Sequence, residues 1–201
     1  VDRLQIKIGA QVQGYDETAH FDRQQLTLYD RFAQFALLAA AEAIGQSGIN
    51  FDGELAEKAG VILGTSGGGL TTQDDNYRTV YEDGKNRVHP FIVPRLMNNA
   101  AVSHVSMTHN LRGPSFTVST ACASSNHAMG QAFNMVRSGM TPAMVTGGAE
   151  ARSTGSKCSR ATGARETARS APRPLPGWGE PPWCRRRPGR PRPPTAPDTQ
   201  A

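Results

Sequence analysis

The sequence predicts an α/β fold with a largely parallel sheet, followed by a basic tail that takes no part in it. Short apolar runs alternate with segments of helical apolar spacing, and the links between the runs suit crossover connections. The tail, residues 152–201, holds ten of the 14 prolines. We therefore divide the chain into a folded body, residues 1–151, and the tail.

Charge separates the same two parts. The body carries 11 Lys and Arg against 14 Asp and Glu, whereas the tail carries 11 against three, so the overall charge of +5 belongs to the tail. Leu175 is the only large aliphatic residue of the tail, which cannot offset its ordering entropy, and we expect disorder. Its Arg, Pro, Gly, Ala and Ser content is typical of a GC-rich gene read in a shifted frame, so a frameshift origin is our leading hypothesis.

The first half of the body predicts strand, helix and strand. Leu4–Ile8 alternates apolar and polar residues and predicts a half-buried strand. A helix follows, with Asp30 near its start and Gly48 beyond its end. The apolar run at 60–65 suits a strand buried on both faces. Residues 74–90 are polar without a period, and we expect an irregular excursion at the surface.

The second half repeats the alternation. Leu96–Leu111 partly fits a helix entered after Pro94, and 115–120 alternates as a strand does. A further helix is stopped by Gly139, and residues 143–148 close the body as a strand. The apolar stripe of that last helix comprises Ala128, Met129, Ala132, Phe133 and Val136.

Cysteine usage and hydropathy indicate a soluble, cytoplasmic chain. Cys122, Cys158 and Cys184 are too few and too scattered for a disulfide framework. The most apolar window is interrupted by Gln34 and Glu42 and is too short to span a bilayer. We expect no metal, because no histidine lies near Cys158 or Cys184 and a structural zinc site needs four ligands.

Cys122 falls where a β-branched run gives way to small residues and then to the last helix. If that helix begins just after Ala121, its N-terminal amides and dipole favour a thiolate, and the same amides can form half of an oxyanion hole. Small neighbours would let an acyl group approach the sulfur. The alternative is a small buried residue without chemistry, which is the commoner role of cysteine.

The sequence motifs around Cys122 favour the nucleophile over the buried residue without chemistry. "LRGPSFTVSTACASSNHAMGQAF" and "MVTGGAEA" resemble the β-ketoacyl-acyl-carrier-protein synthases, the condensing enzymes of the thiolase superfamily, and in particular their chain-elongating type II members. "DRFAQFALLAAAEAI", "GVILGTSGGG" and "HPFIVPRLMNNAA" are similar to the same family in the same order. The resemblance covers nearly all of Val1–Ala151 and implies a thiolase-like fold, here an incomplete first half of its duplicated architecture.

The resemblance also implies an activity in fatty acid biosynthesis. Cys122 would take an acyl chain from a carrier-protein thioester, and a malonyl-carrier thioester would then decarboxylate and attack the acyl-enzyme. The family uses no cofactor and works as a homodimer joined near the strand that leads into the cysteine, here 115–120. Gly67 falls where relatives often have a bulkier residue at the floor of the acyl pocket. A tight turn explains the glycines equally well, and the Lys-Ser/Thr pair of a phosphate-binding loop is absent.

The sequence departs from the family after the cysteine. The family's decarboxylation needs two histidines and a lysine from its second half, but no histidine follows His127, and Lys157 is the only later lysine. We expect His127 to be a packing residue and assign no catalytic role to His104 or His109. The resemblance also places the family's opening strand before Val1, so we expect this chain to hold only the middle of the first half of the fold. We therefore expect at most slow acyl transfer from this chain alone, without condensation.

Two other functions remain open. The thiol motif is shared with ketosynthases for polyketides or other specialised acyl chains. The arginines of "RRRPGRPRPP" suit nucleic acid or an acidic protein partner, and this non-enzymatic function is the less favoured because such segments are usually only solvated.

Overall fold

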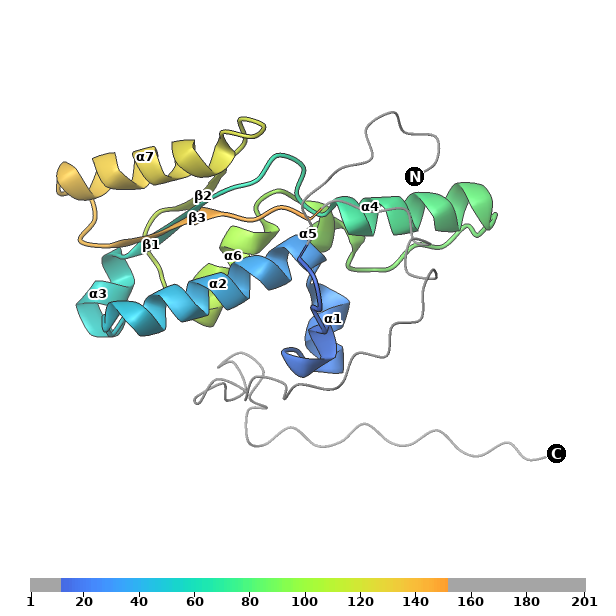
Figure 1. Ribbon diagram of the computed structural model, residues 1–201, viewed down its shortest axis with the longest axis horizontal. Helices are drawn as coiled ribbons and strands as arrows, with labels where there is room; N and C mark the ends of the chain where they lie inside the picture. The colour runs from blue at the N-terminus through green and yellow to red at the C-terminus, as the bar shows by residue number, and fades with distance from the viewer. Residues whose placement is uncertain (1–11, 152–201) are drawn as a thin grey trace.

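The computed structural model describes residues 12–151, so the strand expected at Leu4–Ile8 and the tail lie outside the described residues. Figure 1 shows this part as a small sheet with helices on both faces. In chain order its elements are η1 (Glu17–Ala19), α1 (Arg23–Leu28), α2 (Arg31–Ser47), α3 (Gly53–Lys58), β1 (Gly60–Gly64), α4 (Leu70–Tyr77), the π-helical turn η2 (Arg78–Glu82), α5 (Ile92–Leu96), α6 (Ala100–Thr108), β2 (Ser115–Val118), α7 (Ser124–Arg137) and β3 (Met144–Gly148).

The sheet is parallel, as expected. Within residues 12–151 it has three strands in the order β2-β1-β3, with Val61 opposite both Ser115 and Val145. All five residues of the central strand β1 are buried. Because the strands are parallel, the loops that follow β1 and β2 leave the sheet at the same edge, where ligands bind in open α/β sheets.

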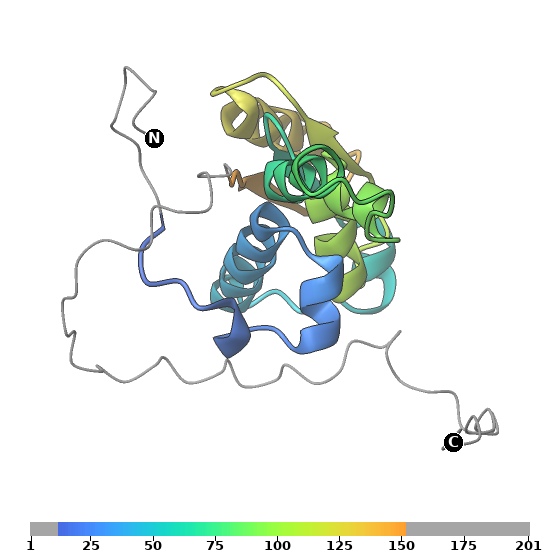
Figure 2. The same ribbon diagram turned by 90° about the vertical axis from the view of Figure 1, so that its right-hand side faces the viewer.

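Helices cover both faces of β1, which explains why its apolar run is continuous. Val61 and Leu63 join a buried cluster with residues of α2 and α6, whereas Ile62 points to the other face and meets Ala128 and Ala132 of α7. Figures 1 and 2 show α7 on one side of the sheet and α2 on the other. The α/β class predicted from the sequence is confirmed.

The predicted boundaries of α2 are confirmed. The carboxylate of Asp30 accepts a hydrogen bond from the Phe32 amide and caps the helix, and Gly48 ends it in the left-handed conformation at φ 66°. The other carboxylate oxygen of Asp30 accepts from the amide and the hydroxyl of Thr72, at 2.7 and 2.6 Å. This buried side chain therefore joins the starts of α2 and α4.

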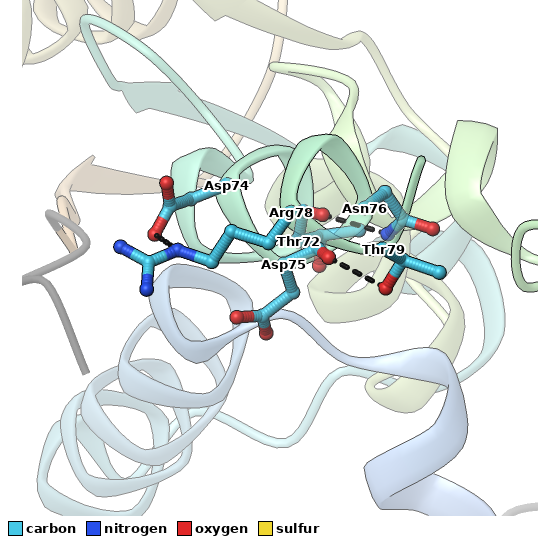
Figure 3. Close-up of polar contacts among 6 residues, drawn as sticks. All are labelled: Thr72, Asp74, Asp75, Asn76, Arg78 and Thr79. Carbon is cyan, nitrogen blue, oxygen red and sulfur yellow. Dashed lines mark hydrogen bonds and ion pairs between the residues drawn. The ribbon is translucent and has the colours of Figure 1, made fainter. Parts of the chain in front are cut away.

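The expected irregular segment at 74–90 is partly wrong, because α4 and η2 extend through its first part to Glu82. Polar contacts between successive turns stabilise these helices in place of an apolar stripe (Figure 3). Arg78 Nε lies 3.1 Å from an Asp74 carboxylate oxygen, and the Asn76 amide donates to the Thr72 carbonyl. A search for apolar periodicity misses such a helix.

Two other predicted helices differ in their bounds. The helix expected over Leu96–Leu111 is the shorter α6, which begins four residues later, at Ala100. A separate helix, α5, precedes it and includes Pro94 in its first turn, where the missing N–H of proline costs no hydrogen bond. The predicted stripe of α7 is split between two faces. Its alanines pack on the sheet, but Met129, Phe133 and Val136 are exposed.

Candidate functional site

Cys122 lies in a strained turn between β2 and α7, which we name the cysteine turn (residues 119–123). Ala121 has φ 50°, a left-handed conformation that costs a residue with a Cβ about 1–2 kcal/mol. The buried Ser124 holds the turn, because its Oγ accepts from the Thr120 amide at 2.8 Å and donates to the Ala121 carbonyl at 2.7 Å. Strain of this kind persists only where its surroundings fix it.

Glycines of the sheet allow the start of α7 to lie directly on the strands. A Cβ built on Gly64 would lie 2.2 Å from the Ser124 carbonyl carbon, and one on Gly148 would lie 2.7 Å from the Ser125 Cβ. Any larger residue would push the helix, and with it the cysteine turn, away from the sheet.

The thiol is accessible, but it precedes the helix. Cys122 is exposed, whereas α7 begins at Ser124 with Ala123 as its N-cap. The helix start expected just after Ala121 is therefore wrong. The amides of Ala123 and Ser124 donate to the carbonyls of Thr120 and Ala121, each at 3.1 Å, so they complete the turn and are not free to bind an oxyanion.

Gly67 lies at the same edge of the sheet, in the glycine loop (residues 65–69) between β1 and α4. A Cβ on Gly67 would lie 2.7 Å from Leu70 Cδ1, so the side chain of Leu70 already fills the space that a larger residue would need. Gly68 has φ 62°, and a Cβ on Gly69 would lie 2.4 Å from the Arg95 carbonyl oxygen. Turn geometry and close packing thus account for Gly68 and Gly69.

A carboxylate that the sequence did not single out holds the glycine loop. Glu150 Oε2 accepts from the Ser66 amide and hydroxyl at 2.6 and 2.7 Å, from the Thr65 hydroxyl at 3.1 Å and from the Gly67 amide at 3.4 Å. The Ser119 hydroxyl donates to the Ser66 carbonyl at 3.4 Å, which joins the loop to the cysteine turn. The only sequence signal was an acidic residue in the otherwise uncharged segment 138–151.

The histidines do not form a site with the thiol. His104 is packed on the ring of Tyr29 with a centroid distance of 4.5 Å, and burial lowers its pKa to about 4. Burial also lowers the pKa of His109. Among the described residues, neither His104 Nδ1 nor His109 Nε2 has a hydrogen-bond partner. His127 is exposed, and the packing role expected for it is wrong in this structure.

An open groove runs between the exposed edge of β2 and α7. Its walls include Thr117 and Thr120 on one side and His127 and Asn134 on the other, and neither Cys122 nor Gly67 lines it. Within residues 12–151 no cluster of three His, Cys, Asp or Glu side chains is placed to hold a metal ion. No helix in this described part is both long and apolar enough to cross a membrane.

Solved ketosynthases have a similar architecture. A ketosynthase in complex with its chain length factor, from Xenorhabdus doucetiae, superposes with a TM-score of 0.57 and 27% identity, covering 66% of this chain and 34% of that one. A β-ketoacyl synthase from Burkholderia phymatum STM815 gives a TM-score of 0.53 and 25% identity over 64% of this chain and 32% of that one. The thiolase-like fold expected from the resemblance is confirmed.

Sequence comparison leads to the same family. Nodulation protein E of Rhizobium sp. (strain N33) is 40% identical over 144 residues, 72% of this chain and 36% of that protein. 3-Oxoacyl-[acyl-carrier-protein] synthase 2 of Staphylococcus aureus (strain N315) is 32% identical over 175 residues, 85% of this chain and 42% of that protein. The chain thus spans about two fifths of the length of these relatives. The model of the β-ketoacyl synthase N-terminal domain matches residues 7–172, beyond the predicted boundary at Ala151, and the chain therefore belongs to the β-ketoacyl synthase family.

Proposed function

We propose that the body is the nucleophile-bearing part of a β-ketoacyl-acyl-carrier-protein synthase of fatty acid biosynthesis, with Cys122 as the acyl acceptor. The observation that carries this proposal is the exposed thiol on a strained turn at the carboxyl edge of the sheet, in a chain of this family. A fixed backbone presents the sulfur to a bound thioester without further ordering.

The proposed step is transthioesterification. The Cys122 sulfur attacks the carbonyl of an acyl-carrier thioester, the bond to the carrier sulfur breaks, and the carrier thiol leaves with a proton. In the complete reaction a malonyl-carrier thioester loses CO₂, and its carbanion displaces the cysteine to give the β-ketoacyl product. We expect the 201-residue chain to perform only the first step, since no histidine follows His127.

Intact-protein mass tests this step. After incubation with an acyl-carrier thioester, the 201-residue chain should gain one acyl group, and Cys122→Ser should gain none. Cys158→Ser and Cys184→Ser control for the other thiols and should acylate as the wild type does. Acylation that survives in Cys122→Ser, or a β-ketoacyl product from the 201-residue chain, would contradict the proposal.

A ketosynthase for a specialised acyl chain, polyketides included, is the second candidate. It is favoured by the higher identity to a protein named for nodulation, 40%, than to a 3-oxoacyl-[acyl-carrier-protein] synthase, 32%. The two candidates differ in the preferred thioester. Faster acylation by a polyketide-like, keto-substituted thioester than by a saturated one of equal length would favour the second candidate.

The exposed edge of β2 supports the homodimer proposed for this chain, whereas the carrier protein is proposed as the partner that delivers the acyl thioester to Cys122. β2 is an edge strand in the described sheet, and Phe116 on it is 40% exposed. Pairing of this strand with a second copy would satisfy its backbone groups. Sedimentation of the wild type and Phe116→Glu tests the dimer, which the added charge should dissociate. An unchanged dimer in Phe116→Glu would contradict the role of this edge.

A further inference from the structure

We propose that Glu150 is a positioning residue: its carboxylate holds the glycine loop against the cysteine turn and thereby sets which acyl chains reach Cys122. This inference rests on the proposed function and adds to it a residue that controls chain selection at the same site.

The contacts of Glu150 are concentrated on one oxygen and one loop. Glu150 Oε2 accepts from two successive amides, those of Ser66 and Gly67, and from the hydroxyls of Thr65 and Ser66. Successive amides that converge on an anion form a nest, and hydrogen bonds to a carboxylate are about twice as strong as neutral ones. The chain has therefore built an anion site that its own side chain fills.

The glycine loop needs such a restraint. Three consecutive glycines, Gly67 to Gly69, give its backbone high conformational entropy and no side chains to pack. The far end of the loop is held by the Gly69 amide, which donates to the Leu96 carbonyl at 3.0 Å. Glu150 provides the matching restraint at the near end, 83 to 85 residues away in sequence.

The restraint extends toward both parts of the proposed site. The amide and the hydroxyl of Ser66 both donate hydrogen bonds to Glu150. The carbonyl of Ser66 accepts one from the hydroxyl of Ser119, three residues before Cys122. Toward α4, the Gly67 amide donates to Glu150, and the side chain of Leu70 lies where a Cβ on Gly67 would be. Releasing the carboxylate would loosen the glycine loop at Gly67, where the resemblance implies the floor of an acyl pocket, and also the contact of the loop with the cysteine turn.

The selectivity test compares Glu150→Ala, Glu150→Gln and the control Glu42→Gln in the 201-residue chain. Glu42 is an exposed carboxylate on α2 that accepts a hydrogen bond from Gln46, so the control neutralises a carboxylate acceptor far from the glycine loop in sequence. The readout is the ratio of the Cys122 acylation rates with C12 and C4 carrier thioesters. We expect Glu150→Ala to change this ratio about tenfold, because small displacements at a reacting site have large effects on rate. Glu150→Gln keeps one acceptor oxygen, so its ratio of acylation rates should be close to that of the wild type.

A probe that needs no acyl pocket separates positioning from general damage. Alkylation of Cys122 by iodoacetamide should stay within about twofold of wild type in all three variants, since the thiol is already exposed. A C12:C4 ratio in Glu150→Ala equal to that of Glu42→Gln would overturn the inference. The inference would also be overturned if the C12:C4 ratio changed only in variants whose Cys122 reacts with iodoacetamide at a changed rate.

Hydrogen exchange of the loop amides is the second readout and requires no acylation. Glu150→Ala should speed exchange at Ser66 and Gly67 about tenfold or more while β1 stays protected. Ser66→Ala removes one of the four donors and should give a smaller effect in the same direction, which serves if Glu150→Ala does not fold. If Glu150→Ala exchanges faster than the wild type but the wild type accepts no acyl group, the proposed function is refuted and the restraint is not. Unchanged exchange would refute the restraint itself.

Discussion

The two faces of the sheet are covered to different depths. On the face of α2 and α6, Val61 and Leu63 join a large buried cluster that includes Phe32 and Leu37. On the face of α7, the buried cluster consists of Ile62, Ala128 and Ala132. A helix of small residues is enough to bury β1, but its large apolar side chains then face outward. The first face is complete within the described residues, whereas the second exposes apolar surface that a further layer would have to cover.

The largest contrast should come from truncating one phenylalanine on each side. Phe32→Ala, at a side chain with no exposed surface, should lower the free energy of unfolding by about 3–5 kcal/mol. Phe133→Ala, at a side chain that is 62% exposed, should change it by less than about 0.5 kcal/mol. Urea denaturation measures both. Equal losses would show that the outer face of α7 is covered in solution.

Two glycines that contact or belong to α7 sharpen the comparison. Gly64→Ala should destabilise by about 2 kcal/mol or more, because its Cβ would meet the backbone of Ser124, which cannot move alone. Gly130→Ala, within α7 and with no atom within 4 Å of its Cβ, should stabilise by up to about 1 kcal/mol through helix propensity. Thermal unfolding compares the two variants, and a harmless Gly64→Ala would contradict the close packing of α7 on β1.

Acid should weaken the α6 side of the fold. The pKa of His104 falls from 6.5 to about 4 on burial, so the unfolded chain binds a proton that the folded chain does not between these values. Stability from this group is therefore present above pH 6.5 and lost as the pH falls toward 4, by about 2–3 kcal/mol. Urea denaturation from pH 7 to pH 4.5 measures the loss.

His104→Phe is the control for this pH dependence, because it keeps an aromatic ring against Tyr29 without a titrating group. It should remove much of the acid sensitivity, and the lowered pKa of His109 leaves a remainder of the same sign. An unchanged profile in His104→Phe would contradict the assignment.

The smallest effect is expected outside both faces, on α4. Arg78→Gln breaks the contact with Asp74 between partly exposed side chains, and pairs of this kind contribute about 0.3–0.5 kcal/mol. Raising the salt concentration should reduce the difference from wild type further. A loss above about 1 kcal/mol would place this pair among the main supports of α4.

The elements that the sequence predicted well are those whose apolar pattern matches their burial. β1 is apolar throughout because both of its faces are covered, and α2 carries an aspartate cap and a terminal glycine. α4 was missed because its stability comes from Asp30 and from polar contacts between turns, which leave no apolar period. The start of α7 was placed too early because the hydrogen bonds of the Ser124 side chain cannot be read from residue types alone.

The site was predictable to a similar degree. Cys122 stood out by its position between a strand and a helix, and the motifs around it identified the family. The role of Glu150 could not be predicted, since its partners in the glycine loop precede it by more than 80 residues. Glu150 follows β3 and the glycine loop follows β1, so their contact can be recognised only when these two strands are known to be neighbours in the sheet.

Asp30 gives the fold a property that neither helix has separately. Its carboxylate caps α2 with one oxygen and binds Thr72 of α4 with the other, so removing it would fray both helices together. Opening of α4 and opening of the first turn of α2 should accordingly be one cooperative event with a single exchange rate. The glycine loop would then lose its support at the α4 end whenever that event occurs. The time for which the hydrogen bonds of Asp30 persist would therefore limit how long the loop near Cys122 keeps one conformation.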